Sequence, residues 1–253
     1  MAVNTYIFIG SPEKSRASVA AECVKNSLPE SAKVLVLAAK GDDTFDESLF
    51  AGTNAEIFRY DTHESVQDFL LENQNADCAL VIANPLCNLA DELEFYKNLN
   101  DNKTVRVVRI FGFVDCKLYT ENPKLCENYF DAVSHFSDCI LLDKTFEAKN
   151  TEVEKLKKRY KKLCLPHEVF TLNKNGLCKM PDVLLIDEAR RLTFAFDDYD
   201  PIDEIELDED TLPDEPFDIQ RKEDEYFKRL DNNSRAKPID DIFDIIKKAD
   251  EKL

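Results

Sequence analysis

Charged and hydroxyl side chains follow the first apolar run of the sequence, in the stretch GSPEKSRAS at residues 10–18. Loops that bind nucleotide phosphates between a strand and a helix follow the pattern G-x-x-x-x-G-K-[ST]. Gly10 matches the first position, but Ser15, Arg16 and Ala17 stand where glycine, lysine and the magnesium-binding hydroxyl belong, and Ser18 comes one place late. Arg16 keeps a positive charge, whereas Ala17 has no oxygen for a metal. The stretch is therefore either an altered anion site at a helix N-terminus, with Arg16 as its main side-chain contact, or an ordinary turn.

The elements that would position this loop alternate regularly along the first 190 residues. Short runs rich in Val, Ile, Leu and Phe are separated by helical patterns, and several runs are apolar throughout, as strands buried on both faces are. The alternation predicts an α/β fold with a doubly wound, mainly parallel sheet covered by helices. The predicted strands span 6–9, 33–39, 55–60, 78–83, 105–111, 139–142 and 168–172, and the predicted helices span 15–26, 64–72, 92–99, 123–136 and 153–164.

The composition changes after about residue 190, so we expect one domain over residues 1–190 and an acidic extension over 191–253. Residues 197–220 contain twelve acidic side chains, three prolines and no Lys or Arg, which is typical of an extended or disordered segment. Beyond it, Ile239, Ile242, Phe243, Ile245 and Ile246 are spaced for one face of a helix. That helix either docks on its own domain or binds a protein partner.

The overall charge and the cysteines exclude several classes of function. The net charge of −18, from 33 basic and 51 acidic residues, argues against nucleic-acid binding. The N-terminal apolar run is too short for a signal peptide or a membrane span, so we expect a cytoplasmic protein that binds no membrane. The eight cysteines lie at least nine residues apart, and His63, His135 and His167 are widely separated, so the sequence predicts no metal site.

Three later segments carry a resemblance to a known family. They are DCALVIANPLCNLADELEFYKNL (77–99), VRVVRIFGFVDCKLY (105–119) and SDCILLDKTFEAKNTEVEKLKKRYKKLC (137–164). Their order, and the phrases VDC and ILLDK, resemble the CobW-type GTPases, relatives of the nickel-handling maturation GTPases. These are P-loop proteins implicated in delivering or sensing metals, and the resemblance covers about residues 3–190. It implies a nucleotide site formed by Gly10, Ser15, Arg16, Ser18, Asp115, Asp143 and Lys144.

The departures from that family affect each working part of such a site. In the guanine-reading N-K-x-D motif only Lys144 is kept, because Asp143 replaces the amide and Phe146 replaces the carboxylate that accepts guanine N–H groups. In the switch segment, Ala83 replaces an acidic residue, and Leu86 occupies about the position where the family has its switch glycine. The cysteine-rich metal motif is absent, since residues 52–76 contain no cysteine and His63 stands alone there.

The phosphate, metal, switch and base-reading motifs are all altered, whereas the order of strands and helices is kept. This combination predicts a pseudo-GTPase. Its function would be non-catalytic, as a cytoplasmic interaction or regulatory protein that contacts a protein partner through the acidic segment or the terminal helix. The alternative is a divergent nucleotide-dependent metal chaperone that binds GTP or GDP with Mg²⁺. A third hypothesis is weak binding of hard cations by the acidic segment, although that segment has no calcium-loop pattern.

Overall fold

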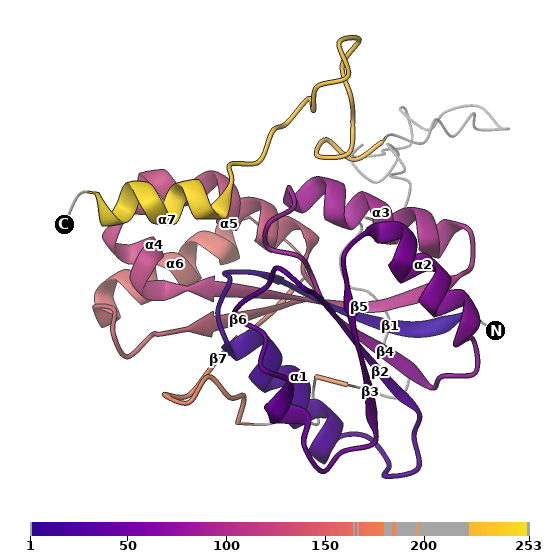
Figure 1. Cartoon of the computed structure of the whole chain (residues 1–253). Coiled ribbons are helices and arrows are strands. Elements are labelled where there is room, and N and C mark those ends of the chain that lie inside the picture. The colour runs from indigo at the N-terminus through magenta and orange to yellow at the C-terminus, as the bar shows by residue number, and fades with distance from the viewer. Residues whose placement is uncertain are drawn as a thin grey trace, which may run out of the picture. The chain divides into compact units, whose positions relative to one another are not determined.

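Seven strands form one parallel sheet in the part of the chain that the computed structural model describes, which is residues 2–163, 165, 167–179, 184–185, 196 and 223–251. The strand order is β3-β2-β4-β1-β5-β6-β7, with β1 at the centre (Figure 1). The strands are β1 (Val3–Gly10), β2 (Val34–Ala39), β3 (Ala55–Tyr60), β4 (Cys78–Ile82), β5 (Val105–Asp115), β6 (Cys139–Asp143) and β7 (Glu168–Thr171).

Helices cover both faces of this sheet, as the alternation predicted. Helix α1 (Ser15–Asn26) packs on one face, where Leu184 and Leu185 join the same apolar core. The opposite face carries most of the remaining helices (Figure 1). Crossovers between parallel strands are right-handed, so a connection that runs toward β7 places its helix on the face opposite to α1, whose connection runs toward β3. The helices on this opposite face are α2 (His63–Glu72), α3 (Leu89–Asp101), α5 (Pro123–Phe136) and α6 (Asn150–Lys162); a short 3-10 helix, Glu47–Phe50, lies between β2 and β3.

The predicted fold class is confirmed, and most predicted elements are present. Helices α1 and α5 begin and end at the predicted residues, and Cys78 and Cys139 are buried in strands of the core. Among the described residues, one α-helix and the short 3-10 helix were missed. The α-helix, α4 (Cys116–Glu121), follows β5 directly, and Asp115 starts it by accepting a hydrogen bond from the Leu118 N–H at 2.8 Å. Six residues are too few to show a helical period in the sequence.

The terminal helix α7 (Ile242–Asp250) packs against α5 of its own chain (Figure 1). The Asp241 carboxylate accepts hydrogen bonds from the first N–H groups of the helix, and Ile242, Ile245 and Ala249 are buried. A hydrogen bond from the Asp240 N–H to Asn128 Oδ1, at 2.8 Å, fixes the entry to the helix on α5. The apolar face that the sequence predicted therefore lies mostly against the domain.

The structure divides into two compact units, Met1–Thr193 with Ile239–Leu253, and Phe194–Pro238. In the second unit, Tyr226 and Phe227 are buried, and Arg229 and Arg235 form an antiparallel bridge. The acidic stretch 197–220 lies outside the described residues, and the domain boundary near residue 190 stays a prediction. None of the described helices is long and apolar enough to cross a membrane.

Candidate functional site

The loop after β1 is bound closely to the neighbouring strand β5. Gly10 has a φ of +102°, and a Cβ atom at this position would lie 2.2 Å from the carbonyl oxygen of Phe113. The Ser11 N–H donates to that same oxygen at 2.9 Å, and Ser11 Oγ accepts the Asp115 N–H at 2.9 Å. The glycine that matches the phosphate-loop pattern is thus required by the approach of β5 itself.

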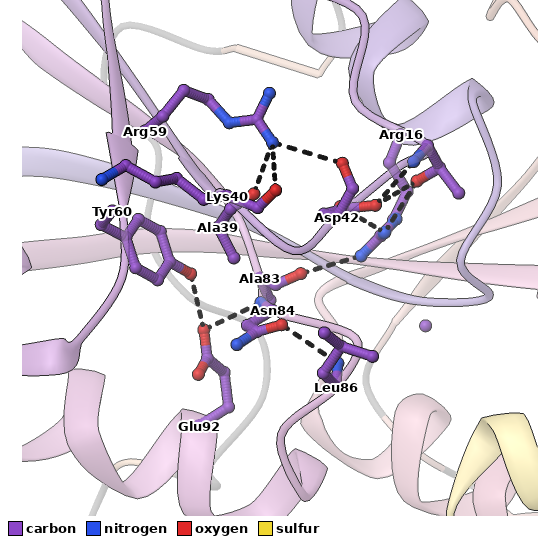
Figure 2. Close-up of polar contacts among 12 residues, drawn as sticks. Arg16, Ala39, Lys40, Asp42, Arg59, Tyr60, Ala83, Asn84, Leu86 and Glu92 are labelled. Carbon is purple, nitrogen blue, oxygen red and sulfur yellow. Dashed lines mark hydrogen bonds and ion pairs between the residues drawn. The ribbon is translucent and has the colours of Figure 1, made fainter.

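Arg16, at the lysine position of the pattern, points into the protein interior (Figure 2). Its guanidinium donates to the carbonyl oxygen of Ala83 and to Asp42 Oδ2, both at 2.9 Å, and to Thr44 Oγ1 at 3.2 Å. Arg16 is 1% exposed and the Asp42 side chain is fully buried. The guanidinium therefore connects α1 to the segments that follow β2 and β4.

The two serines of the loop differ in their surroundings. Ser15 is buried beside the turn at Gly176, where an added Cβ would lie 3.0 Å from Ser15 Cβ. Within the described part of the chain, Ser15 Oγ has no hydrogen-bond partner. Ser18 is partly exposed on α1, and its N–H donates to the Lys14 carbonyl at 3.0 Å. Ser15 is thus covered by a later turn.

Lys144 and Asp115 come together as the resemblance implied, but as partners of each other. Lys144 Nζ lies 2.8 Å from Asp115 Oδ2 and 2.7 Å from Glu13 Oε1. Burial lowers the pKa of Lys144, but the hydrogen bonds and charges of the two carboxylates outweigh it and raise that pKa above its ordinary value. Asp143 is also buried, and its carboxylate accepts the Lys144 N–H at 2.7 Å.

A cavity of about 620 Å³ opens beside these side chains. Four carboxylates and two lysines line it, so its formal charge is 2 − 4 = −2. Its walls come from the loop after β1, from α4 and from α7: Ser11, Pro12, Glu13, Asp115, Lys117, Leu118, Glu121, Asn122, Lys144, Ile246, Ala249 and Asp250. Phe146, in the base-reading position, is 48% exposed, with Lys174 Nζ 5.9 Å from its ring centre.

His63 does not stand alone, which corrects the expectation from the sequence. Its Nε2 lies 2.6 Å from Glu92 Oε2. A ring nitrogen of His63, the Sγ of Cys87 and a carboxylate oxygen of Glu92 all lie within 4.8 Å of one another. The hydrogen bond and charge of Glu92 raise the pKa of His63, although burial opposes the shift. Burial and the nearby Glu92 charge raise the pKa of the Cys87 thiol. Only the position of these residues near the ends of β3 and β4 could have indicated that they meet.

Comparison with known proteins gives matches in structure alone. No protein-family model matches the sequence, and no curated protein matches it by sequence. Chloroplast FtsY from Physcomitrella patens matches with a TM-score of 0.50 at 16% identity, over 68% of this chain and 59% of that chain. The Zn(II)-bound YjiA GTPase from E. coli matches with a TM-score of 0.48 at 13% identity, over 74% of this chain and 64% of that chain.

A third structure of similar likeness is the hydrogenase maturation factor HypB from Archaeoglobus fulgidus. It matches with a TM-score of 0.48 at 14% identity, over 72% of this chain and 88% of that chain. This chain spans less than two thirds of the length of the FtsY and YjiA structures. At such identities the likeness shows the fold alone, which is the α/β, P-loop NTPase-like fold of the FtsY structure.

Proposed function

We propose that this chain is a pseudo-GTPase of CobW-like type, a P-loop scaffold that acts without catalysis as an interaction or regulatory protein. The observation that carries the proposal is the buried ion pair between Arg16 and Asp42, with 2.9 Å between guanidinium and carboxylate. The cation at the phosphate-binding position thus neutralises an acid of its own chain. Buried charges have to be paired, so this contact serves the folded state.

The residues present do not fit a magnesium–triphosphate group. Turning Arg16 toward a phosphate would leave Asp42 buried and unpaired, which costs about 3–5 kcal/mol when one partner of such a pair is lost. Lys144 is held by Glu13 and Asp115, and the cavity beside it carries an excess of carboxylates that repels phosphate. Ala17, which stands at the hydroxyl position, offers no metal ligand.

The base-reading positions support the same proposal. A guanine site needs a carboxylate that accepts two N–H groups, whereas Phe146 presents a ring that is about half exposed. Asp143, in the asparagine position, accepts the backbone N–H of the following lysine. Neither side chain offers the donor and acceptor pattern that distinguishes guanine.

A protein partner is a ligand that such a scaffold can bind without a nucleotide site. The apolar face of α7 is largely occupied by α5, which leaves the acidic segment 197–220 as the favoured contact. Twelve carboxylates without a basic residue are complementary to a basic protein surface, and long-range attraction of this kind speeds association at low salt. We therefore propose a basic protein partner, bound through that segment in the cytoplasm.

Calorimetric titration of the full chain with GTP, GDP and ATP, each with and without Mg²⁺, tests the proposal. We expect dissociation constants of about 1 mM or weaker for all three nucleotides, with no effect of Mg²⁺. Micromolar, Mg²⁺-dependent binding of GTP or GDP would contradict it and support the alternative, a nucleotide-dependent metal chaperone.

Two variants locate any binding that is seen. If the loop after β1 is the site, Arg16→Ala weakens phosphate binding about tenfold or more, since a charge-assisted hydrogen bond contributes roughly 1.5–3 kcal/mol. Lys40→Ala is the matched control, because Lys40 is an exposed cation whose ion pair with Asp61 lies at the surface. Circular dichroism of both variants checks that they remain folded.

A further inference from the structure

We propose that His63, Cys87 and Glu92 form a binding site for a divalent transition metal, with Zn²⁺ as the best fit. The imidazole Nε2, the thiol Sγ and a carboxylate oxygen all lie within 4.8 Å of one another. None of these residues belongs to a metal motif, and residues 52–76 contain no cysteine. The site does not rest on the proposed function, since it involves no residue of the loop after β1.

The fold brings these three residues together from distant parts of the sequence. His63 is the first residue of α2, directly after β3, and Thr62 caps that helix with a reciprocal pair of hydrogen bonds to Ser65. Cys87 lies in the loop after β4, and Glu92 lies in the first turn of α3. Strands β3, β2 and β4 are neighbours, so their carboxyl ends present these side chains at one edge of the sheet, where open parallel sheets bind ligands.

Hydrogen bonds orient the carboxylate toward the proposed site. Glu92 is 1% exposed, and its Oε1 accepts the Asn84 N–H at 3.0 Å and the Tyr60 hydroxyl at 3.3 Å (Figure 2). Its other oxygen, Oε2, faces His63 at 2.6 Å. Metal-ligating carboxylates are held in this way by a second layer of donors, which fixes the oxygen that remains for the metal.

The other two ligands are also held in place. The His63 ring stacks on Phe95, with ring centres 4.2 Å apart and planes 5° from parallel. Asn84 Nδ2 donates to Cys87 Sγ at 3.3 Å, which holds the sulfur beside the other two ligand atoms. The site is accessible, because the His63 side chain is 33% exposed and Cys87 is only partly buried.

The donor set selects the class of metal. One nitrogen, one sulfur and one oxygen suit Zn²⁺ and Co²⁺, whereas Mg²⁺ and Ca²⁺ require several oxygens. Bond lengths of about 2.0–2.3 Å place tetrahedral ligand atoms roughly 3.3–3.6 Å apart. The His63–Glu92 pair would open by less than about 1 Å from its 2.6 Å separation, and the thiol, within 4.8 Å of both, would close by no more than about 1.5 Å. A fourth position stays open for water or a ligand from a partner.

Titration of the full, reduced and chelator-treated chain with Co²⁺ and then Zn²⁺ tests this site. We expect one Co²⁺ per chain with a thiolate-to-cobalt charge-transfer band, and loss of that band when Zn²⁺ displaces the cobalt. Cys87→Ser should abolish the band and weaken Zn²⁺ binding at least tenfold, and His63→Gln should weaken it to a similar extent. Cys178→Ser is the matched control, because Cys178 is equally partly buried and lies outside the cluster.

Three results would overturn the proposal: no Co²⁺ binding, a charge-transfer band that survives Cys87→Ser, or equal Zn²⁺ affinity in all variants with competition by Ca²⁺. The last result would place the ion on carboxylates such as those of residues 197–220. Cys87→Ala is a second variant in case the serine disturbs folding, which circular dichroism monitors. Nucleotide titrations without transition metal keep this test separate from that of the pseudo-GTPase proposal.

Discussion

Two groups of polar side chains contact the segment after β4 from opposite faces of the sheet. Arg16 reaches the Ala83 carbonyl from α1, and Glu92 reaches the Asn84 N–H from α3 (Figure 2). In the first group, around Arg16, the cation is fully buried with its acid. In the second group, the His63–Cys87–Glu92 cluster, the carboxylate is buried but the imidazole and the thiol can be reached from outside.

The two groups show that a residue's type and its position in a motif do not decide whether it can bind a ligand. Arg16 stands in a sequence position that suggests ligand binding, yet the two terminal nitrogens of its guanidinium donate to acceptors of its own chain. The His63–Cys87–Glu92 cluster has no recognisable motif, yet three kinds of metal-ligating atom meet there. Exposure and pairing, rather than a motif, decide which group remains available to a ligand.

Removing the Arg16 side chain should have the largest effect. Arg16→Ala is expected to lower the free energy of unfolding by about 3–5 kcal/mol, because it leaves the fully buried Asp42 carboxylate without its cation. Urea unfolding measures this. Adding Asp42→Asn should restore part of the loss, since it removes the uncompensated charge. A loss below about 1 kcal/mol would mean that the pair contributes little.

Gly10→Ala should have the second-largest effect and lower the free energy of unfolding by about 2–4 kcal/mol. The methyl group would lie 2.2 Å from the Phe113 carbonyl oxygen, and the φ of +102° is strained for alanine. Gly52→Ala is the control, because Gly52 also has a positive φ but no atom lies within 4 Å of the added carbon. Equal losses in the two variants, measured by thermal or urea unfolding, would argue against the close approach of β5.

Lys144→Met should lower the free energy of unfolding by about 1–2 kcal/mol, because it leaves the largely buried Asp115 carboxylate without its cation. The effect stays moderate because Lys144 and Glu13 are partly exposed to water. Lys40→Met, which breaks an exposed pair with Asp61, should change the free energy of unfolding by less than about 0.5 kcal/mol. If the two variants lower the free energy of unfolding equally, Lys144 does not stabilise the fold through its ion pairs, and that result would favour a role for Lys144 in a nucleotide site.

The smallest effect concerns the pH dependence of stability at His63. Glu92 raises the pKa of His63 in the folded state, so the stabilisation is fully present below the unfolded value of about 6.5 and is lost as the pH rises through the folded pKa. Compared with His63→Gln, the unmodified chain should therefore gain stability at low pH, by less than about 1 kcal/mol. Unfolding curves from pH 5 to 9 measure the difference, and a gain at high pH would contradict the pair.

Local patterns in the sequence predicted elements well and contacts between them poorly. The bounds of α1 and α5 could be predicted because their apolar periods and flanking residues are local signals. The partner of Arg16 is 26 residues away, and the meeting of His63 with Glu92 spans 29 residues. Both depend on the strand order β3-β2-β4, which no local pattern contains. That is why His63 was expected to stand alone.

Urea unfolding of the full chain with and without about 1 mM GTP and Mg²⁺ tests most directly whether the phosphate-binding positions are closed by the protein's own side chains. A ligand that binds the folded state stabilises it by RT ln(1 + [L]/Kd). We predict a shift in the free energy of unfolding below about 0.5 kcal/mol, as for a dissociation constant of about 1 mM or weaker. A stabilisation of about 4 kcal/mol, which corresponds to micromolar binding, would show that a nucleotide site is open and would contradict the account.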